Sequence, residues 1–328
     1  MKLGIIGSRG HLHVVMSALK EMDDVEVVAA ARWGKGDPLA FTAEPQYAGV
    51  PIYDDYRVML DKETADVAAV FVPFAELATA ATAAAEHNCH VFMEKPLATT
   101  HADLARLREA VYTAGVQAVG CFAMRGKSAY LTIRKAVAAG RIGKVIYATA
   151  QKSYPFADRD EFYATRESYG GTIPWVAIHA LDYLSWCTGQ DYRRVAAVGS
   201  NLAHPSRPGL EDAGGILAEL TGGGAAVLNF DYFRPWGKLK RIWGDDRLRI
   251  AGTDGIIETK DSGTAVELMT PDATEMLPLE EPVNIFTEFV AGLRGEKEPF
   301  ISTEDSFRIT EVALKARDAQ DTGKFIEV

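Results

Sequence analysis

Leu3-Gly4-Ile5-Ile6-Gly7-Ser8-Arg9-Gly10 opens the chain with a short apolar run that ends in a glycine turn. Residues 11–22 follow with apolar side chains at helical spacing, and residues 25–30 are again apolar. This order predicts a βαβ unit, in which backbone N–H groups of the turn and the helix start hold a pyrophosphate. We therefore expect a dinucleotide to contact Gly7, Ser8, Arg9, Gly10 and His11.

The turn departs from the usual G-x-G-x-x-G pattern. Arg9 stands at the second glycine position and Leu12 at the third, while Gly10 is displaced. A plain turn between strand and helix, without a ligand, therefore remains an alternative on this segment alone.

The alternation of strand and helix continues to about residue 121. Apolar strands are predicted at 67–72, 90–93 and 116–120, and helices at 75–86 and 103–114. Such alternation is typical of a parallel, doubly wound sheet. We predict a Rossmann dinucleotide-binding domain over residues 1–121.

The second half of the chain changes character. Alternating stretches at 145–152, 195–200, 215–219, 225–232 and 247–251 are separated by glycine pairs, which favours a large, mostly antiparallel sheet. Amphipathic helices are predicted at 284–294 and 303–321. We expect an α+β domain for substrate binding and oligomerisation over residues 122–328, with the last helix, near 303–320, as a candidate to pack back on the first domain.

Composition limits the partners. The chain has 328 residues, 48% of them hydrophobic, and a formal net charge of -10, which argues against nucleic acid or an anionic membrane surface. No apolar run reaches the roughly 20 residues that span a bilayer, and the start leads directly into a strand pattern. The three cysteines lie far apart in the sequence, which fits reduced thiols. We expect a cytoplasmic protein with a small-molecule ligand.

The end of the second strand bears on cofactor choice. An acid there hydrogen-bonds the ribose of NAD, whereas an arginine accommodates the 2′-phosphate of NADP. The sequence reads Ala31-Arg32-Trp33, so Arg32 favours NADP over NAD. An ordinary solvated Arg32 is the alternative.

Glu94-Lys95-Pro96 follows the apolar strand His90-Val91-Phe92-Met93. Ligands of open α/β sheets bind outside the carboxyl ends of the strands, so Lys95 stands where chemistry is expected. Pro96 disfavours continuation into a helix. A surface turn with a solvated ion pair would be the simpler interpretation of an isolated Glu-Lys-Pro.

At this point the chain resembles the Gfo/Idh/MocA oxidoreductases over nearly its whole length. The resemblance rests on Gly4-Ile5-Ile6-Gly7, Val91-Phe92-Met93-Glu94-Lys95-Pro96-Leu97, Gly140-Arg141-Ile142-Gly143-Lys144-Val145, Gly170-Gly171 with His179 in Ile178-His179-Ala180-Leu181-Asp182, and Gly252-Thr253-Asp254-Gly255.

The resemblance implies an NAD(P)-dependent enzyme that moves a hydride between nicotinamide and a hydroxyl or carbonyl carbon of a sugar, cyclitol or related polyol. Lys95 would be the acid/base, its pKa lowered by burial beside the nicotinamide, with Glu94 positioning the turn and His179 assisting. The resemblance also implies a homo-oligomer, dimer or tetramer, through the second domain's sheet.

Several positions depart from the family pattern. Trp175 stands where the family usually has an aspartate, four residues before His179. After Val72-Pro73, Phe74 stands in place of the usual asparagine and Leu77 in place of the usual histidine. The cofactor pocket is therefore expected to be apolar at Val72, Pro73 and Phe74. Together with the glycine turn and Arg32, we expect these residues, Glu94 and Lys95 to contact the cofactor. We expect the substrate to contact Arg125, Trp175, His179 and Asp182.

The departures keep other functions open. One is a cofactor-binding sensor or subunit without dehydrogenase turnover; another is a hydrolase or lyase that uses tightly bound NAD for transient oxidation. His11-x-His13 and His87-x-x-His90 lack a third ligand, so we expect no metal. A tyrosine-containing loop with Tyr154, Tyr163 and Tyr169 is a candidate substrate lid, although simple loop packing is as good an interpretation.

Overall fold

The computed structural model describes residues 1–34, 36–235 and 243–328. The chain divides into unit 1, Met1–Ala123 with Asn284–Thr310, and unit 2, Met124–Val283 with Glu311–Val328. The sequence analysis predicted a boundary after residue 121, with the last helix, near 303–320, as a candidate to pack back on the first domain. In the structure residues 284–310, which include the start of that helix, group with unit 1.

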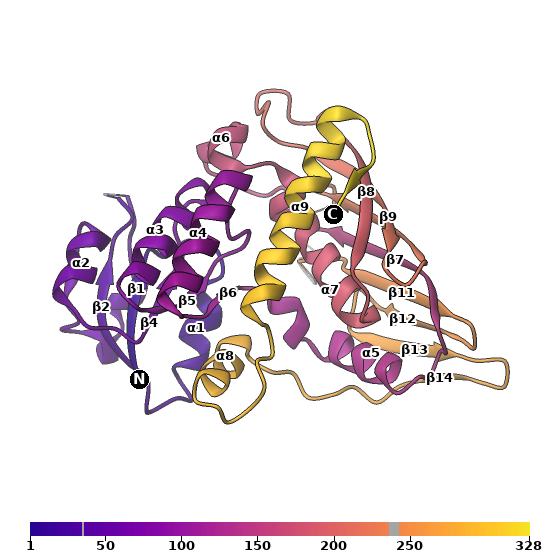
Figure 1. The fold of residues 1–328 in the computed structure, drawn as a ribbon, viewed down its shortest axis with the longest axis horizontal. Coiled ribbons are helices and arrows are strands. Elements are labelled where there is room, and N and C mark those ends of the chain that lie inside the picture. The colour runs from indigo at the N-terminus through magenta and orange to yellow at the C-terminus, as the bar shows by residue number, and fades with distance from the viewer. Residues whose placement is uncertain (35, 236–242) are drawn as a thin grey trace. The chain divides into compact units, whose positions relative to one another are not determined.

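Unit 1 is built on a six-stranded parallel sheet in the order β3-β2-β1-β4-β5-β6 (Figure 1). Its strands are β1 (Lys2–Ile6), β2 (Glu26–Ala31), β3 (Ile52–Tyr53), β4 (Val67–Val70), β5 (His90–Met93) and β6 (Ala118–Gly120). The central strand β4 is buried along its whole length, as expected for a parallel strand covered on both faces. The predicted Rossmann-type doubly wound sheet is confirmed.

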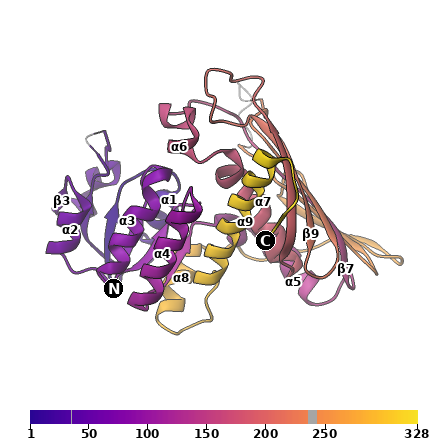
Figure 2. The same cartoon turned by 45° about the horizontal axis from the view of Figure 1, so that its top comes forward.

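The helices of unit 1 lie on both faces of this sheet (Figures 1 and 2). They are α1 (Leu12–Ala18), α2 (Tyr56–Lys62), α3 (Phe74–Glu86), α4 (His101–Ala114) and α8 (Ile285–Leu293), with 3₁₀ turns η1 (Ala40–Ala43) and η2 (Pro45–Tyr47). The strand order reverses direction between β1 and β4, so right-handed crossovers put α1 on one face and α3 and α4 on the other. Helix α8 packs against α1.

Residues 284–310 join unit 1 through both apolar and polar contacts. The ring of Phe92 in β5 lies 5.1 Å from the ring of Phe286 in α8. Helix α9 (Thr303–Thr322) begins beside the edge strand β6, where its hydroxyls accept hydrogen bonds: Thr303 from the N–H of Ala118 at 3.1 Å and Ser306 from that of Gly120 at 3.2 Å. The hydroxyls satisfy backbone donors that an edge strand would otherwise leave unpaired.

Unit 2 is built on a nine-stranded sheet in the order β14-β13-β12-β11-β7-β10-β9-β8-β15. The strands are β7 (Val145–Ser153), β8 (Tyr192–Ser200), β9 (Ala213–Leu220), β10 (Ala225–Asp231), β11 (Arg247–Gly252), β12 (Ile256–Lys260), β13 (Ala265–Met269), β14 (Thr274–Met276) and β15 (Ile326–Glu327). All neighbours are antiparallel except β7 and β10, so the predicted mostly antiparallel sheet is confirmed.

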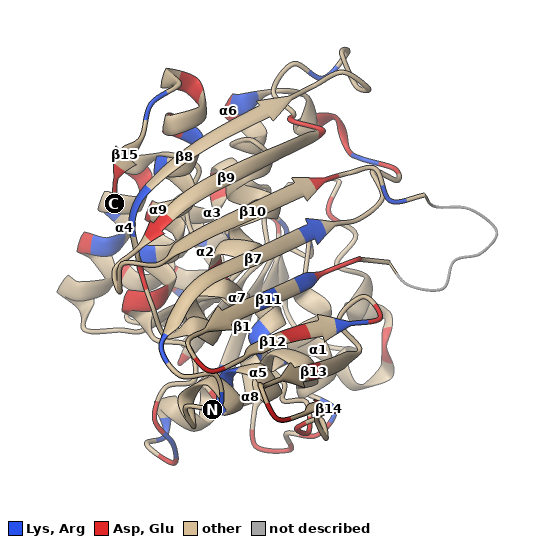
Figure 3. Cartoon of the chain, turned by 90° about the vertical axis from the view of Figure 1, so that its right-hand side faces the viewer, with Lys and Arg blue, Asp and Glu red and all other residues tan. Residues whose placement is uncertain are grey.

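One face of the nine-stranded sheet is covered by helices. The helical elements of unit 2 are η3 (Ala123–Gly126, which starts at the unit boundary), α5 (Ser128–Ala138), η4 (Glu161–Ala164), α6 (Arg166–Tyr169), the π-helical turn η5 (Ile173–Ala177), α7 (Ile178–Thr188) and the end of α9. Helix α7 contacts β7 and β10, and α5 contacts β12 and β13. In β10 buried residues alternate with exposed ones, and Figure 3 shows the strands lying side by side on the opposite face.

None of the helices in the described residues is long and apolar enough to cross a membrane.

Candidate functional site

The glycine turn after β1 is wedged between its two neighbouring strands. The N–H of Gly7 donates to the carbonyl of Ala31 at the end of β2 at 2.8 Å, and the N–H of Arg9 donates to the carbonyl of Phe71 just beyond β4, also at 2.8 Å. Gly7 has a φ of 75°, and a Cβ there would lie 2.5 Å from the Phe71 carbonyl oxygen. Only glycine meets both conditions, so the turn is fixed at the carboxyl edge of the sheet.

Gly10 is in contact with the segment after β5. Its φ is 63°, and a Cβ at this position would overlap the carboxylate of Glu94. The displaced glycine of the sequence motif therefore has a structural reason that the motif alone did not reveal. It makes room for an acidic side chain 84 positions further along the chain.

Glu94 is completely buried and hydrogen-bonded on both oxygens. Its Oε2 accepts from the backbone N–H of His11 at 2.6 Å and lies 2.8 Å from His11 Nδ1, while Oε1 accepts from the N–H of Lys95 at 2.9 Å. Burial would raise the pKa of Glu94, but the charge and hydrogen bonds of His11, together with Lys95, outweigh it and hold the pKa below its ordinary value. Glu94 therefore joins the glycine turn to Lys95.

Lys95 is fully buried directly after β5. The bond to Pro96 is a cis peptide, and the N–H of Leu97 reaches the hydroxyl of Thr310 at 3.4 Å. The backbone on both sides of Lys95 is thus held by hydrogen bonds to buried side chains. An ammonium group is costly to bury, and such positions are more frequent in functional sites than elsewhere.

Asp37 is a residue near the glycine turn that the sequence analysis missed. It is buried, accepts a hydrogen bond from the hydroxyl of Ser8, and receives the backbone N–H groups of Trp33 at 3.3 Å and Leu39 at 3.2 Å. The guanidinium of Arg32 donates to the backbone carbonyl of Asp37. The sequence signal was available in Gly36-Asp37-Pro38, because an aspartate in a Gly/Pro loop commonly orders that loop through its carboxylate.

The end of β4 supplies an apolar wall. Val72 and Phe74 are both buried, and Phe74 begins α3 directly after Pro73. A Cβ on Gly7 would come within 2.9 Å of a Val72 methyl group. All eleven residues predicted to contact the cofactor therefore lie in unit 1, at or just beyond the carboxyl ends of the adjacent strands β2, β1, β4 and β5.

This edge of unit 1 fits a dinucleotide in part. The two positive-φ glycines and the crevice position suit a pyrophosphate close to the backbone. The N–H of His11 already donates to Glu94, so this donor of the turn is not available to a phosphate. Arg9 lies with its guanidinium carbon 5.6 Å from the ring of Trp33.

Unit 2 carries the residues predicted to contact substrate. His179 lies in the first turn of α7, and Trp175 lies in the π-helical turn that precedes it; both are buried. π-helical turns occur frequently at functional sites. Because a π-helical turn holds more residues than a turn of α-helix, the angle about the helix axis between Trp175 and His179 differs from that in a regular α-helix.

Arg125 and Asp182 pair with each other. The guanidinium donates to both carboxylate oxygens of Asp182, with Nε at 3.0 and 3.2 Å and Nη2 at 2.7 Å, and both side chains are buried. Asp182 follows His179 by three residues, so the two side chains emerge from the same face of α7. Each charge is compensated by the other, so the pair holds the helix of His179 in place.

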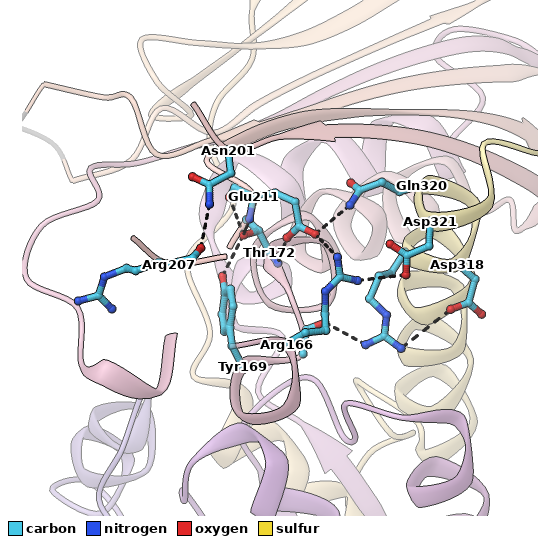
Figure 4. A network of polar contacts seen from close by, with 11 residues as sticks. Arg166, Tyr169, Thr172, Asn201, Arg207, Glu211, Asp318, Gln320 and Asp321 are labelled. Carbon is cyan, nitrogen blue, oxygen red and sulfur yellow. Dashed lines mark hydrogen bonds and ion pairs between the residues drawn. The ribbon is translucent and has the colours of Figure 1, made fainter. Parts of the chain in front are cut away.

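A polar network fixes the glycine pair ahead of this helix (Figure 4). The buried carboxylate of Glu211 accepts from the N–H of Thr172 at 2.6 Å, from Arg166 at 2.8 Å and from Gln320 at 2.9 Å. Arg317 donates to the carbonyl of Gly170 at 2.9 Å. Glu211 was not predicted from the sequence, because its partners lie 39 to 109 positions away.

Within the part of the chain that the structure describes, no group of three or more His, Cys, Asp or Glu side chains is arranged to hold a metal. His87 lies 3.1 Å from Asp61, and His90 accepts the backbone N–H of Gln117.

Comparison with known proteins agrees with this two-domain fold. The family model described as "Oxidoreductase family, NAD-binding Rossmann fold" matches residues 1–121, and the model of the GFO/IDH/MocA C-terminal domain matches residues 130–258. A solved structure from Thermotoga maritima, provisionally assigned as an oxidoreductase, is 33% identical, with complete coverage of both chains and a TM-score of 0.93.

Two relatives with assigned activities are more distant. The 1,5-anhydro-D-fructose reductase of Ensifer adhaerens is 27% identical over 252 residues, which cover 73% of this chain and 72% of the relative. The inositol 2-dehydrogenase of Salmonella typhimurium is 27% identical over 197 residues, which cover 59% of this chain and 54% of the relative.

Proposed function

Because the chain belongs to the Gfo/Idh/MocA family of oxidoreductases, with its NAD-binding Rossmann domain, we propose that it is a dehydrogenase or reductase acting on CH–OH groups of a sugar, cyclitol or related polyol. The observation that carries the proposal is the fully buried Lys95 at the carboxyl end of β5, joined to the glycine turn by Glu94 and His11. The named activities of the two relatives support the substrate class.

Lys95 is the proposed acid/base. Bound NAD would supply the hydride chemistry, so the protein has to move one proton at the substrate oxygen. The Nζ of Lys95 takes the hydroxyl proton in oxidation and returns it in reduction. Glu94 acts as a positioning residue, because its carboxylate accepts the backbone N–H of Lys95 and so fixes the lysine's main chain.

His179 is proposed to hydrogen-bond the substrate oxygen or to relay its proton. The Arg125–Asp182 pair would orient α7, and the flat indole of Trp175 would face the apolar side of the ring of the substrate. In this account Arg125 and Asp182 contribute to substrate binding mainly by placing His179.

Arg32 and Asp37 favour different cofactors. Arg32 is the residue from which the sequence predicts NADP, whereas the buried carboxylate of Asp37 places a negative charge beside Ser8 of the glycine turn. A phosphate dianion near that charge would be repelled, and Arg32 already donates to the Asp37 carbonyl. We therefore propose NAD as the preferred cofactor, with Arg32 as the residue responsible for any binding of NADP.

A thermal-shift titration with NAD, NADH, NADP and NADPH tests the cofactor, and a sugar and polyol screen read at the nicotinamide absorbance tests the reaction. The proposal expects a raised melting temperature with NAD or NADH and a redox change with at least one polyol. A sensor would bind cofactor without turnover. A hydrolase or lyase would retain the cofactor through purification with no net redox change.

We also propose a homo-oligomer formed through the uncovered face of the nine-stranded sheet (Figure 3). Val198, Leu217 and Val227 are 73%, 46% and 40% exposed there, and Leu217 pairs with Val227 across β9 and β10. Isolated exposed apolar residues are ordinary, but neighbours on one sheet face indicate a contact surface. Light scattering of Leu217→Lys/Val227→Lys against wild type tests it: the proposal expects a dimer or tetramer that dissociates, and a monomeric wild type would contradict it.

A further inference from the structure

Two strands of unit 2 end together in a pair of tyrosines. β7 and β10 run parallel, with Ser153 paired to Asp231, so Tyr154 and Tyr232 follow at the same edge of the sheet. Their rings are in edge contact with centroids 5.4 Å apart. Both are buried. Each of the neighbouring parallel strands β7 and β10 is thus followed at its carboxyl end by a tyrosine, and the two rings are in contact.

Arg159 is packed among these rings. Its guanidinium carbon lies 4.9 Å from the ring centroid of Tyr232, 5.1 Å from that of Tyr163 and 5.6 Å from that of Tyr154. The ring of Tyr163 in turn lies 4.8 Å from that of Tyr169. We call Tyr154, Arg159, Tyr163, Tyr169 and Tyr232 the Arg159 cluster.

The guanidinium has little hydrogen bonding of its own. Its Nε is buried without a hydrogen-bond partner in the described residues, and Nη2 reaches the carbonyl of Pro155 only at 3.5 Å. The backbone of Arg159 is fixed, because its carbonyl accepts from Arg207 at 2.9 Å. Because Nε is buried, only the donors on Nη1 and Nη2, four of the five on a guanidinium, remain for a ligand.

No carboxylate compensates this charge. Among the described residues, no Asp or Glu lies within ion-pair distance of Arg159, and the stretch 236–242 and Lys35 contain neither residue type. The contrast with Lys152 is direct. Lys152 lies 5.4 Å from the same Tyr154 ring but is paired with Asp246 at 2.8 Å.

The tyrosines do not supply the missing negative charge. Burial, the largest cause in each case, raises the pKa values of Tyr154, Tyr169 and Tyr232 well above the ordinary value, so their phenols are neutral at physiological pH. A half-buried cation surrounded by neutral rings is therefore compensated only when an anion binds.

The Arg159 cluster adjoins the segment that carries His179. The hydroxyl of Tyr169 is 2.6 Å from that of Tyr232 and donates to the hydroxyl of Thr172 at 3.3 Å. Thr172 caps the π-helical turn that leads to His179, and this turn contacts β10. A ligand group bound by Arg159 would therefore be connected, through Tyr169 and Thr172, to the segment that carries the proposed substrate contact His179.

We propose that the Arg159 cluster binds the carboxylate of the substrate, which makes the substrate a sugar acid. The inference rests on the proposed oxidoreductase function and narrows its substrate class. The planar fork of arginine matches a carboxylate with two parallel hydrogen bonds, and the buried tyrosine rings pack around this fork. One uncompensated cation suits a monoanion, since the nearby Lys152 is already neutralised by Asp246.

Calorimetric titration with the full-length protein tests this inference. The ligands are glucuronate, galacturonate and gluconate, with glucuronamide, glucose and myo-inositol as neutral counterparts and glucose 6-phosphate as the phosphate counterpart. The proposal expects at least one acid to bind and glucuronamide to bind roughly 10- to 100-fold more weakly than glucuronate, as loss of a charge-assisted hydrogen bond requires. This comparison needs no variant.

Arg159→Gln should weaken binding of the acid by the same factor, and Arg159→Lys by less, with the affinity for NADH unchanged in both. Arg194→Gln is the matched control, because Arg194 also stacks on an aromatic ring of unit 2, 4.9 Å from that of Phe325, but outside the cluster. It should bind the acid as wild type does.

Three results would overturn the inference: equal binding of glucuronate and glucuronamide, unchanged acid binding in Arg159→Gln, or Arg159-dependent binding of the phosphate in place of the acids. If NADH binds and wild type oxidises a neutral polyol while none of the acids binds, the oxidoreductase function stands and the acid subsite fails. If no nicotinamide nucleotide binds, the oxidoreductase function fails irrespective of Arg159.

Discussion

The backbone N–H of His11 donates to Glu94 Oε2 at 2.6 Å, and His11 Nδ1 lies 2.8 Å from the same oxygen. These residues are 83 positions apart and belong to the two motifs from which the function is inferred. The contact makes the glycine turn and the Glu94-Lys95-Pro96 segment a single structure. A substitution in either segment should therefore also disturb the conformation of the other.

Replacing Glu94 tests this coupling. Glu94→Gln keeps the shape but removes the negative charge that faces His11, and we expect the free energy of unfolding to fall by about 2–4 kcal/mol because the site is fully buried. Urea denaturation measures the loss. Glu86→Gln, at an exposed position of α3, serves as the control and should change stability by less than about 0.5 kcal/mol.

The contact between His11 and Glu94 also predicts that the stability of the protein depends on pH. The folded pKa of Glu94 is lowered, so its contribution to stability is present above the unfolded pKa of about 4.3 and is lost as the pH falls through the folded pKa. The difference in stability between wild type and Glu94→Gln should shrink below about pH 4. A difference that grows on acidification would contradict the assignment.

Gly10→Ala should be more damaging than an ordinary glycine substitution. The new Cβ would overlap the Glu94 carboxylate, in addition to the strain of a φ of 63°. Gly115→Ala is a matched control, since Gly115 has a φ of 68° and open space around its Cβ position. We expect Gly115→Ala to cost about 1 kcal/mol and Gly10→Ala at least twice that, with weaker nucleotide binding in Gly10→Ala alone. Equal losses in the two variants would show that Glu94 is not confined by the turn.

The charge of Asp37 should set cofactor preference. We expect wild type to bind NADH more tightly than NADPH, and Asp37→Asn to reduce the ratio of the two affinities roughly 10-fold, because the repulsion of the 2′-phosphate is removed. Fluorescence titration of the two reduced nucleotides measures the ratio. Asp54→Asn is the control, because Asp54 is exposed and 3.8 Å from Arg32. Tighter binding of NADPH by wild type would instead support Arg32 as the deciding residue.

Glu211 should support turnover without touching cofactor. Glu211→Gln weakens the network in Figure 4 that fixes Gly170 and Thr172, so we expect a loss of about 1–3 kcal/mol in stability and a lower kcat, with the affinity for NADH unchanged. Glu161→Gln removes an almost fully exposed carboxylate 3.8 Å from Arg207 and should alter neither quantity. A wild-type kcat in Glu211→Gln would separate the network from the reaction.

Much of the fold was predictable because its signals are local. Apolar strands such as residues 90–93, and glycine turns between them, mark a parallel sheet by composition alone, and the predicted strands of the second half correspond to β7 through β11. Strands β12 and β13 and the short edge strands β3, β14 and β15 were not predicted. Strands of two or three residues carry no periodicity, and they form because a neighbour offers free backbone groups.

The candidate site was predictable only in part, for a related reason. Motifs pointed to Gly7, Lys95 and His179, whose neighbours in sequence are distinctive. Glu211 carries no motif, since its partners lie 39 to 109 positions away. The signal for Asp37 in Gly36-Asp37-Pro38 was overlooked. Arg159 was not singled out, because its contact with Tyr232 forms only when β10 is placed beside β7. The pairing of Arg125 with Asp182 was equally hidden, because 57 positions separate them.

The most direct test of the account is the rate of nicotinamide oxidation or reduction by Lys95→Ala on a polyol or sugar acid that wild type turns over. We predict a rate 10²- to 10⁴-fold lower, as loss of a general acid/base requires, with a thermal shift by NADH that shows the variant still folded and able to bind. Lys20→Ala, at an exposed position outside the site, should match wild type. A Lys95→Ala variant that turns over at the wild-type rate would contradict the central claim.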